Sequence, residues 1–548
     1  MREFDYVIVG GGSAGCVLAN RLSVDRANSV LMMEAGGRDW SPLIHAPGGM
    51  LPIMLSGAYS WRYQSLPQKH LNGRVLFMPR GKVLGGSSST NGLVYDRGSA
   101  ADFDGWARLG NRGWSYADVL PYFKRAESHP LGESEYHGGN GPLRVSRPGV
   151  AHPLAKAFVE AGLQAGYSYN GDTNGATREG FGPTDITAWR GRRSSAAVGY
   201  LRPAASRPNL TILTKARATH VLIEDKQAVG VEWSSGGRAR QVRARREVIL
   251  SAGALQSPQL LMLSGIGDAD ELRSHGIAVQ HDLKGVGRSL QDHLAIAVKY
   301  TASQPVSLFK YLDPLHGAMA LAQYGLLRTG PLANPGMEAA AFVSSDLSNH
   351  GPDLKLLLVM ALYRNNGREL IPMHGFAAHI NVVRPESFGS LRLQSDNPFD
   401  PPLIDQNYLE STNDRQVLRE GVRIARRVFS QSAFDTFRGT ELEPGGNISS
   451  DADIDAFIRE RAEADYHTVG TCRMGRDDQA VVDDSLRVHG IAGLRVVDAS
   501  VMPRIVGGNT NMPVIMIAEK AADLILDKSI GVDDETNTLR SNQLMEAR

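Results

Sequence analysis

The sequence predicts an α/β fold in which a second, mixed α+β domain is inserted into the first. Residues 5–34 read as strand, glycine-rich turn, helix and strand, and strand-like runs return between residues 210 and 250. From about residue 305 to residue 461 the pattern changes to mixed strands and helices. The 548 residues also exceed what one hydrophobic core usually supports, so two or more domains are expected.

The N-terminal β–α–β unit is the strongest local signal. An apolar strand at residues 5–9 runs into a Gly-x-Gly-x-x-Gly turn formed by Gly10, Gly12 and Gly15, and a helical run follows. Gly10 permits the tight turn, Gly12 lets the backbone approach a pyrophosphate, and Gly15 lets helix and strand pack closely. The helix N-terminus then faces the phosphates, so the turn predicts a dinucleotide site.

The second strand of this unit, at residues 30–33, ends in Glu34. An acidic side chain about 20 residues beyond the glycines can bond a ribose hydroxyl, and an acid rather than an arginine there disfavours NADP. Strand, turn, helix, strand and acid in register favour a dinucleotide fingerprint over an ordinary glycine turn.

The next two segments, residues 40–80 and 81–92, have the composition of loops that lie over a bound ligand. Residues 40–80 are rich in Gly, Pro and Ser and predict a long, ordered excursion. Residues 81–92 form a second glycine and hydroxyl cluster, whose backbone could lie against a flat or anionic ligand. A flexible Gly/Ser loop is the alternative, which the apolar neighbours Leu84, Val94 and Tyr95 disfavour.

Later segments extend the sheet and build the inserted domain. Strand-like runs at residues 210–213, 220–223, 229–233 and 247–250 resume the first sheet, and a helix is expected at residues 257–263. Residues 319–327 are apolar enough for a lid or a membrane-surface helix, but a buried helix is the expectation. The polar tail from Asn537 is expected to fray.

The composition excludes several classes of protein. A hydrophobic content of 42%, a charged content of 21% and a net charge of +1 are typical of a globular protein without a nucleic-acid footprint. Two cysteines, Cys16 and Cys472, exclude a disulfide framework and favour a reducing compartment. No secretion signal or membrane span is apparent, so a cytoplasmic protein is expected, with peripheral membrane contact as an alternative.

Four ordered blocks of the sequence resemble one enzyme family over nearly the whole chain. The blocks are residues 5–34, residues 81–92, residues 253–267 and the final stretch with His467 and Asn509. They resemble the glucose–methanol–choline (GMC) oxidoreductases, which bind FAD. Residues 401–408 and 497–503 are most similar to the bacterial choline and aliphatic alcohol dehydrogenases of that family.

The resemblance implies the domain organisation. A Rossmann-like FAD-binding domain would carry an inserted substrate-binding domain, built on an antiparallel sheet flanked by helices. The FAD-binding domain is expected to take residues 1–155, 206–304 and 465–548, with a lid-like excursion at about 40–80, and the substrate-binding domain residues 156–205 and 305–464.

The resemblance also implies which residues hold FAD. The expected set is Gly10, Gly12, Ser13, Ala14, Gly15, Glu34, Ala35, Arg80, Gly86, Ser87, Asn91, Gly92, Val94, Ala218, Asp498, Ala499, Asn511 and Met512. Thr90 stands where some members carry a histidine joined covalently to the flavin. FAD is therefore expected to be held noncovalently, and no metal site is expected.

The expected chemistry lies near the C-terminus. Oxidising an alcohol requires removal of the hydroxyl proton and transfer of a hydride from the same carbon to flavin N5. Imidazole is the side chain whose ordinary pKa already suits the first step. By resemblance, His467 is this base and Asn509 hydrogen-bonds the alkoxide oxygen.

Three residues depart from the family pattern. Thr468 follows the histidine where a proline is common. Asp465 replaces a usually apolar residue and is expected to raise the pKa of His467. Met512 stands where a small residue is frequent and is expected to narrow the pocket edge.

Several other polar residues are interpreted as structural. His293 and His379 are interpreted as satisfied core residues. Asp102, Asp104 and the basic run at residues 190–193 are interpreted as solvated surface.

The sequence therefore predicts an FAD-dependent dehydrogenase of primary alcohols that passes electrons to a quinone or another acceptor. An oxidase of the same family that uses oxygen, and a choline dehydrogenase, are the alternatives. A flavin protein that has lost alcohol oxidation is disfavoured by the His467 and Asn509 pair. A nicotinamide enzyme is disfavoured by the second glycine cluster.

Overall fold

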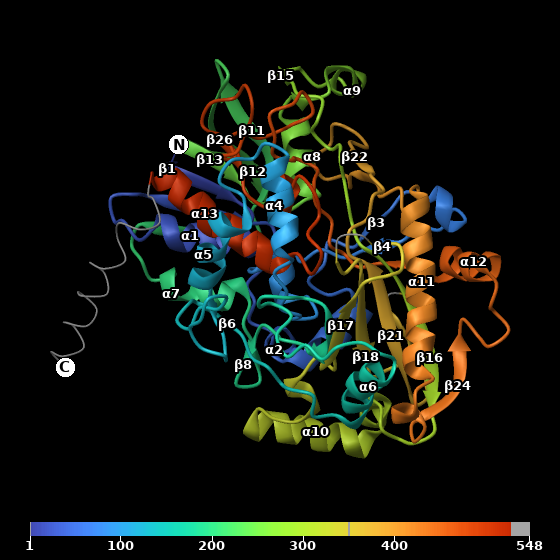
Figure 1. The fold of residues 1–548 in the computed structure, drawn as a ribbon. Coiled ribbons are helices and arrows are strands. Elements are labelled where there is room, and N and C mark those ends of the chain that lie inside the picture. The colour runs from blue at the N-terminus through green and yellow to red at the C-terminus, as the bar shows by residue number, and fades with distance from the viewer. Residues whose placement is uncertain (1, 349–350, 366, 528–548) are drawn as a thin grey trace.

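A computed structural model of the chain describes residues 2–348, 351–365 and 367–527 (Figure 1). Within them, two seven-stranded sheets carry most of the core. The expected frayed tail from Asn537 lies outside the described residues.

The first sheet contains the N-terminal β–α–β unit. Its strands run in the order β10-β2-β1-β13-β12-β11, with β26 beside β13. They are β1 (Arg2–Val9), β2 (Val30–Glu34), β10 (Leu210–Thr214), β11 (Arg217–Glu224), β12 (Gln227–Ser235), β13 (Arg238–Leu250) and β26 (Leu494–Val496). β1 lies parallel to both β2 and β13, and α1 (Ser13–Leu22) packs against α13 (Asn511–Leu526). The predicted strands of the nucleotide-binding sheet are confirmed.

The second sheet is antiparallel in every pair. Its order is β24-β16-β21-β18-β17-β7, with β25 beside β16. The strands are β7 (Gly180–Pro183), β16 (Leu294–Ala302), β17 (Ala339–Val343), β18 (Leu354–Val359), β21 (Gly375–Val382), β24 (Arg438–Glu443) and β25 (Glu463–Ala464). The helices α6 (Pro153–Gln164) and α11 (Thr412–Phe429) flank it. The antiparallel sheet flanked by helices is confirmed, although β16 enters it before the expected boundary at residue 304. The domain ranges stay predictions.

Smaller elements connect the sheets. The other helices are α2 (Pro42–His45), α3 (Met50–Ser56), α4 (Ala100–Arg108), α5 (Tyr116–Ala126), α7 (Arg202–Ala204), α8 (Gln256–Leu263), α9 (Ala269–Ser274), α10 (Pro314–Leu327) and α12 (Asp451–Arg461). The paired short strands are β3 (Tyr63–Gln64) with β4 (Phe77–Met78), β5 (Glu127–Ser128) with β6 (Leu143–Arg144), β8 (Ala188–Trp189) with β9 (Arg192–Arg193), β14 (Ile266–Gly267) with β15 (His281–Asp282), β19 (Tyr363–Arg364) with β20 (Glu369–Leu370), and β22 (Ser390–Arg392) with β23 (Leu403–Asp405).

The two faces of the second sheet have different partners. Side chains alternate along a strand, so β18 buries Leu354, Leu356 and Leu358 in the core. Leu354 contacts the position of Gly421 on α11, so this face is the helix-covered one. Lys355 and Leu357 point the other way and line a cavity. This alternation decides which polar residues of the strand reach the site.

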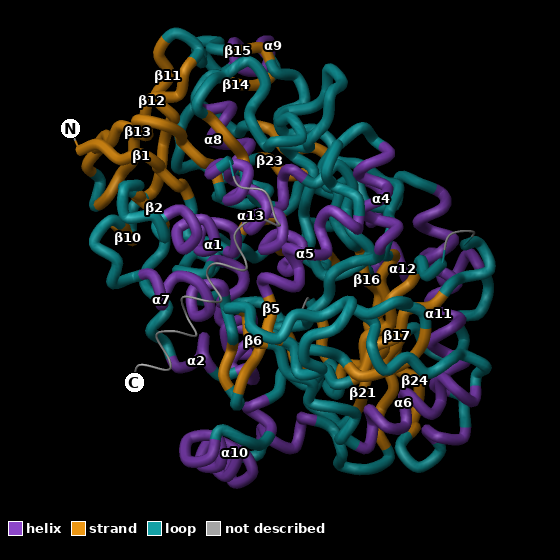
Figure 2. Tube along the Cα trace, turned by 60° about the vertical axis from the view of Figure 1, so that its left-hand side comes forward, coloured by secondary structure: helices purple, strands orange, loops and turns teal. Residues whose placement is uncertain are grey.

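The helix α10 is not buried, so that expectation is wrong. It lies apart from both sheets at the lower edge of Figure 2, and its exposed side chains include Leu326 at 83%. Only Ala320 and Tyr324 of this helix are buried, because the helix packs mainly on the short turns at Leu308–Leu312 and Pro331–Ala333. It forms part of a cavity wall. No helix among the described residues is long and apolar enough to cross a membrane.

Asp102 is buried rather than a surface residue. It belongs to the capping box of α4, pairs with Arg384 at 3.1 Å, and accepts a hydrogen bond from the Gly507 amide at 2.9 Å. Asp104 is half-buried and accepts from the Tyr116 amide at 2.9 Å. The partners Arg384 and Gly507 lie far along the chain from Asp102, so its burial could not be read from the local sequence.

The basic run divides in the same way. Arg190 and Arg192 are exposed, as expected. Arg193 is 1% exposed, and its guanidinium donates to the carbonyl and side-chain oxygens of Asn91 at 2.8 and 2.7 Å. Arg193 therefore holds the second glycine cluster through Asn91, and the interpretation of Arg193 as a surface residue is wrong.

Candidate active site

One cavity of about 910 Å³ is lined by residues of both sheets. It gathers nearly all of the predicted site residues: Gly10, Gly12, Ser13, Ala14, Glu34, Ala35, Arg80, Gly86, Ser87, Asn91, Gly92, Val94, Ala218, His467, Asp498, Ala499, Asn509 and Asn511. Segments hundreds of residues apart thus form one surface.

The glycine turn has the geometry that its spacing predicts. Gly10 has a φ of +101°, and a Cβ there would lie 2.4 Å from the Ser251 carbonyl oxygen. A Cβ on Gly15 would lie 1.9 Å from the Gly10 carbonyl oxygen, so helix and strand pack closely there. At Gly12 a Cβ would meet nothing closer than 4.0 Å, so this backbone faces open space. Helix α1 has no side-chain cap, which leaves its N-terminal amides available to an anion.

Glu34 lies under this turn. Its carboxylate accepts hydrogen bonds from the amides of Gly11 at 2.9 Å and Gly36 at 2.7 Å. Burial raises the pKa of Glu34 to about 7. Ser13 donates to Asn511 Oδ1 at 2.8 Å, which ties the turn to the start of α13. Glu34 both holds the turn and lines the cavity where a ribose is expected.

Two predicted residues do not line the cavity. Gly15 acts through packing alone, as described above. Met512 is 1% exposed and belongs to the hydrophobic core, so the expectation that it narrows the pocket edge is wrong. A contact between Met512 and the cofactor stays a prediction.

His467 and Asn509 lie side by side. Asn509 Nδ2 is 3.0 Å from His467 Nε2, and an amide nitrogen can only donate. His467 Nε2 is therefore the acceptor, and the ring proton sits on Nδ1. This tautomer leaves a lone pair on the nitrogen that faces Asn509, as a general base requires.

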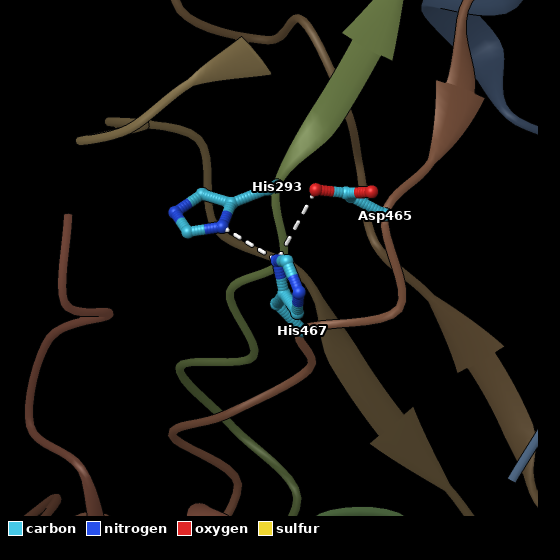
Figure 3. A group of neighbouring side chains, drawn as sticks. All are labelled: His293, Asp465 and His467. Carbon is cyan, nitrogen blue, oxygen red and sulfur yellow. Dashed lines mark hydrogen bonds and ion pairs between the residues drawn. The ribbon is translucent and has the colours of Figure 1, made fainter. Parts of the chain in front are cut away.

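The opposite nitrogen of His467 faces two side chains (Figure 3). His467 Nδ1 lies 2.9 Å from His293 Nδ1 and 3.4 Å from Asp465 Oδ2. His293 Nε2 lies 3.1 Å from the Val383 carbonyl oxygen, which can only accept. His293 therefore carries its proton on Nε2 and accepts the His467 proton at Nδ1. Burial, and then the facing His467, lower the pKa of His293 to about 3, so it is neutral.

His293 is thus more than the core residue that was expected. It is buried, but it supports the predicted base. His379 also differs from expectation, because it lies on the cavity wall and bonds Asp465 at 3.2 Å. His293 directly precedes β16, and a polar ring at the start of a strand of the second sheet is the sequence feature that could have indicated its role.

Asp465 is enclosed by donors. It accepts from His379 and from Asn381, and it faces His467. Burial opposes its charge, yet the facing His467 and the His379 hydrogen bond hold the pKa of Asp465 well below its usual range. His293, Asp465 and His467 each place one potential metal-ligand atom within 4.8 Å of the others. The hydrogen bond between the two histidines and the ion pair with Asp465 account for this spacing. The expectation of no metal stays a prediction.

The pKa of His467 is lowered, not raised. Burial is the largest cause; Asp465 acts in the expected raising direction, while Lys355 and Arg80 act against it. Asp465 does raise the pKa of His467, as expected, but the other effects are larger and the resulting pKa is below the ordinary value. His467 is neutral and able to accept a proton near neutral pH.

The backbone around His467 is held by the buried carboxylate of Asp292. Asp292 accepts from the His467 amide at 2.6 Å, from the Thr468 hydroxyl at 3.1 Å and from the Tyr408 hydroxyl at 2.9 Å. Arg80 donates to the Tyr466 carbonyl at 2.9 Å and to the Thr468 hydroxyl. Thr468 thus replaces the common proline with hydrogen bonds that fix the same segment. Asp292 was not singled out from the sequence.

Lys355 is another functional candidate that sequence reasoning missed. Its Nζ lies 2.5 Å from Asn509 Oδ1 and 3.1 Å from Asp96 Oδ2, and its side chain is 7% exposed. The signal was a single lysine within the apolar run at residues 354–359. A buried ammonium needs acidic or polar partners, and here one of them is the predicted catalytic amide.

Comparison with known proteins decides the family. The family models described as GMC oxidoreductase match residues 4–295 and 385–518. The chain belongs to the GMC oxidoreductases. An oxygen-dependent choline dehydrogenase of Brucella ovis is 46% identical over 543 residues, covering 99% of this chain and 97% of that protein. The mitochondrial choline dehydrogenase of Homo sapiens is 46% identical over 534 residues, covering 95% of this chain and 90% of that protein.

Solved structures agree with the fold. Pyridoxine 4-oxidase from Mesorbium loti has a TM-score of 0.87 at 33% identity, covering 96% of this chain and 100% of its own. Formate oxidase from Aspergillus oryzae, an FAD protein, has a TM-score of 0.90 at 28% identity, covering 96% of this chain and 98% of its own. The Rossmann-like FAD-binding fold and the GMC oxidoreductase assignment are confirmed.

FAD is the cofactor of this GMC oxidoreductase, and the cavity fits it. The open backbone at Gly12 and the uncapped start of α1 suit a pyrophosphate, and Glu34 lies at the end of β2. Gly86 has a φ of +52°, and a Cβ there would lie 2.8 Å from Gly12 Cα, so the two glycine clusters meet. Thr90 lines the cavity and has no imidazole that could bond the flavin covalently. Noncovalent attachment of FAD stays a proposal.

Proposed function

We propose that this GMC oxidoreductase oxidises a primary alcohol to the aldehyde, with His467 as general base and Asn509 as the hydrogen-bond donor to the substrate oxygen. The observation that carries this proposal is the 3.0 Å contact between Asn509 Nδ2 and His467 Nε2 in the cavity that fits FAD. A hydroxyl oxygen that enters between them can accept from Asn509 and donate its proton to His467.

The chain's own residues prepare this proton transfer. His467 is neutral, its Nδ1 proton is held by His293, and its Nε2 lone pair faces the cavity. Once His467 is protonated, the half-buried Asp465 carboxylate stabilises the imidazolium at 3.4 Å. Asn509 donates to the oxygen as negative charge develops on it. Bound FAD supplies the acceptor for the hydride.

The electron acceptor is proposed to be a quinone or another acceptor, with oxygen as the alternative. The protein is also proposed to be cytoplasmic, with peripheral membrane contact as the alternative. The exposed apolar side chains of α10 support the alternative of contact with a membrane surface.

Choline is the second candidate substrate, because the 46%-identical relatives are choline dehydrogenases. A quaternary ammonium needs an aromatic cage or a carboxylate. Lys355 places a fixed positive charge on the cavity wall beside Asn509, and like charges repel strongly where water is excluded. The same wall also carries the Asp465 carboxylate, 3.4 Å from His467, so the charges of the site are compatible with both a neutral alcohol and choline.

The test is an anaerobic visible spectrum of the flavin-loaded protein before and after mixing with primary alcohols. Choline and its uncharged isostere 3,3-dimethyl-1-butanol form a matched pair that differs in charge alone. Bleaching by the neutral alcohols supports the proposal, and faster bleaching by choline moves the assignment to choline oxidation. Recovery on admission of air separates an oxidase from a dehydrogenase. A flavin band that no alcohol bleaches contradicts alcohol oxidation.

A further inference from the structure

We propose that Lys355 is a positioning residue of the reaction: its ammonium orients the Asn509 amide so that the NH₂ group faces His467 and the substrate oxygen. This inference rests on the proposed alcohol oxidation. It assigns a role to a buried charge that the general-base mechanism alone does not use.

The first step of the argument is the direction of the hydrogen bonds. An ammonium has three donors and no acceptor, so the atom of Asn509 that lies 2.5 Å from Lys355 Nζ must be the oxygen. The nitrogen of the same amide then lies 3.0 Å from His467 Nε2. If the amide turned over, its NH₂ would face the ammonium and its oxygen would face the lone pair of His467. Both contacts would be repulsive.

The second step is the strand that carries the lysine. Lys355 is the cross-strand partner of Asn381, and Leu357 is the partner of His379, in the antiparallel pair β18 and β21. All four side chains line the cavity. The sheet therefore presents one cation to Asn509 and, through Asn381 and His379, two donors to Asp465. Only 7% of the Lys355 side chain is exposed, so its ammonium depends on Asn509 and Asp96 as hydrogen-bond partners.

The third step is the charge around the lysine. Asp96 pairs with Lys355 at 3.1 Å and with Arg178 at 2.7 Å. One carboxylate thus faces two cations, and the group keeps a net positive charge next to Asn509. A cation that bonds the amide oxygen polarises the amide and strengthens the hydrogen bond that its N–H groups donate. The alkoxide that forms on loss of the proton gains most from this effect.

The chain offers a matched control in the same sheet, on β16, which lies on the other side of β21. Lys299 of β16 lies 2.7 Å from Glu443, with side chains 7% and 9% exposed, so it is a buried ion pair of the same sheet. It does not line the cavity. Lys299→Met removes a comparable buried cation without touching Asn509.

The decisive experiment is a double-mutant cycle on the anaerobic rate of flavin reduction by a saturating alcohol. Lys355→Met should lower the rate by roughly 10- to 100-fold, less than the roughly 10²- to 10³-fold cost of removing a donor outright, because the Asn509 amide itself is retained. In the Asn509→Ala background the same substitution should lower the rate little further, because the lysine acts through the amide. Lys299→Met should leave the rate near that of the wild type. Fully additive losses from Lys355→Met and Asn509→Ala, or an equal loss in Lys299→Met, would overturn the proposal.

A second readout does not depend on turnover. In holoenzyme labelled with ¹⁵N-histidine, the titration of His467 should move to higher pH in Lys355→Met, because a facing positive charge is removed. The other charged groups facing His467 are Asp465, Arg80 and Asp96, with neutral His293 on its far side, and all are retained. An unchanged titration contradicts the proposal. If no alcohol reduces the wild-type flavin, the proposed function fails on that measurement, while this titration still tests whether the Lys355 charge acts on the Asn509–His467 pair.

Discussion

The Nδ1 atoms of His293 and His467 lie 2.9 Å apart, and one proton joins them. The Val383 carbonyl fixes the proton of His293 on its other nitrogen, so the shared proton belongs to His467. The Val383 carbonyl, through His293, thus supports the same tautomer of His467 that the Asn509 amide requires. The arrangement orients the base without an acidic side chain at the hydrogen-bonding position.

Replacing His293 should therefore affect the reaction more than the fold. His293→Gln should keep FAD and lower kcat/KM for the alcohol roughly 10- to 100-fold, or about 1.4 to 2.7 kcal/mol in the barrier, because His467 Nδ1 loses the imidazole acceptor that supports the tautomer set by Asn509. Steady-state kinetics on the flavin-loaded protein measure this. His489→Gln, which removes a ring contact with the Gly475 carbonyl, is the control. Equal kinetics in the two variants would contradict the role of His293.

His293 should also make the protein sensitive to acid. Its pKa is about 3 in the folded protein, below the ordinary value near 6.5, so the unfolded chain binds more protons between these values. This contribution to stability is fully present above about pH 6.5 and is lost as the pH falls toward 3. Urea unfolding at several pH values should show a shallower loss of stability in His293→Gln than in the wild type. A parallel pH dependence of the two proteins would argue against it.

The general base can be tested directly. His467→Ala should retain the visible flavin spectrum and lose roughly 10²- to 10⁴-fold in turnover, the usual contribution of a general base. Comparison of flavin content and anaerobic reduction rate separates loss of cofactor from loss of chemistry. Turnover close to the wild-type rate would remove His467 from the proposed role.

Asp465 should set the pH dependence of activity. Its carboxylate raises the pKa of His467 against the larger effect of burial, so Asp465→Asn should lower that pKa further. The base works when it is deprotonated, so kcat/KM rises with pH through the pKa of His467, and this rise should move to lower pH in the variant. A pH profile between 4 and 9 measures the shift. Movement to higher pH would show that Asp465 acts in the opposite sense.

Glu34 should control retention of FAD. The carboxylate accepts from two backbone amides, and Glu34→Gln would turn an NH₂ donor toward one of them. The lost contact should cost about 1 to 3 kcal/mol in stability, and FAD should bind more weakly, because the glycine turn is less well held. Thermal unfolding and flavin release on dilution report the two effects. The molecules that still hold FAD should reduce at the wild-type rate; a slower rate would place Glu34 nearer the chemistry.

The sequence by itself determined the glycine turn, the strands of the first sheet and the motifs that contain His467 and Asn509, and its family resemblance implied the antiparallel second sheet. These features depend on local backbone requirements, such as the φ of +101° at Gly10, and on motifs whose spacing carries over along one chain. Local steric rules leave direct marks in sequence, so they could be predicted without knowing what each segment contacts.

Only the tertiary structure decided which polar residues surround the base. His293, Asp292 and Lys355 lie 174, 175 and 154 residues from the groups they bond, and each reaches the site from a strand or turn of another segment. For the same reason Asp102 and Arg193 proved to be buried supports and α10 proved to be exposed. A polar or apolar side chain records its own chemistry in the sequence, but its burial depends on which distant surface folds against it.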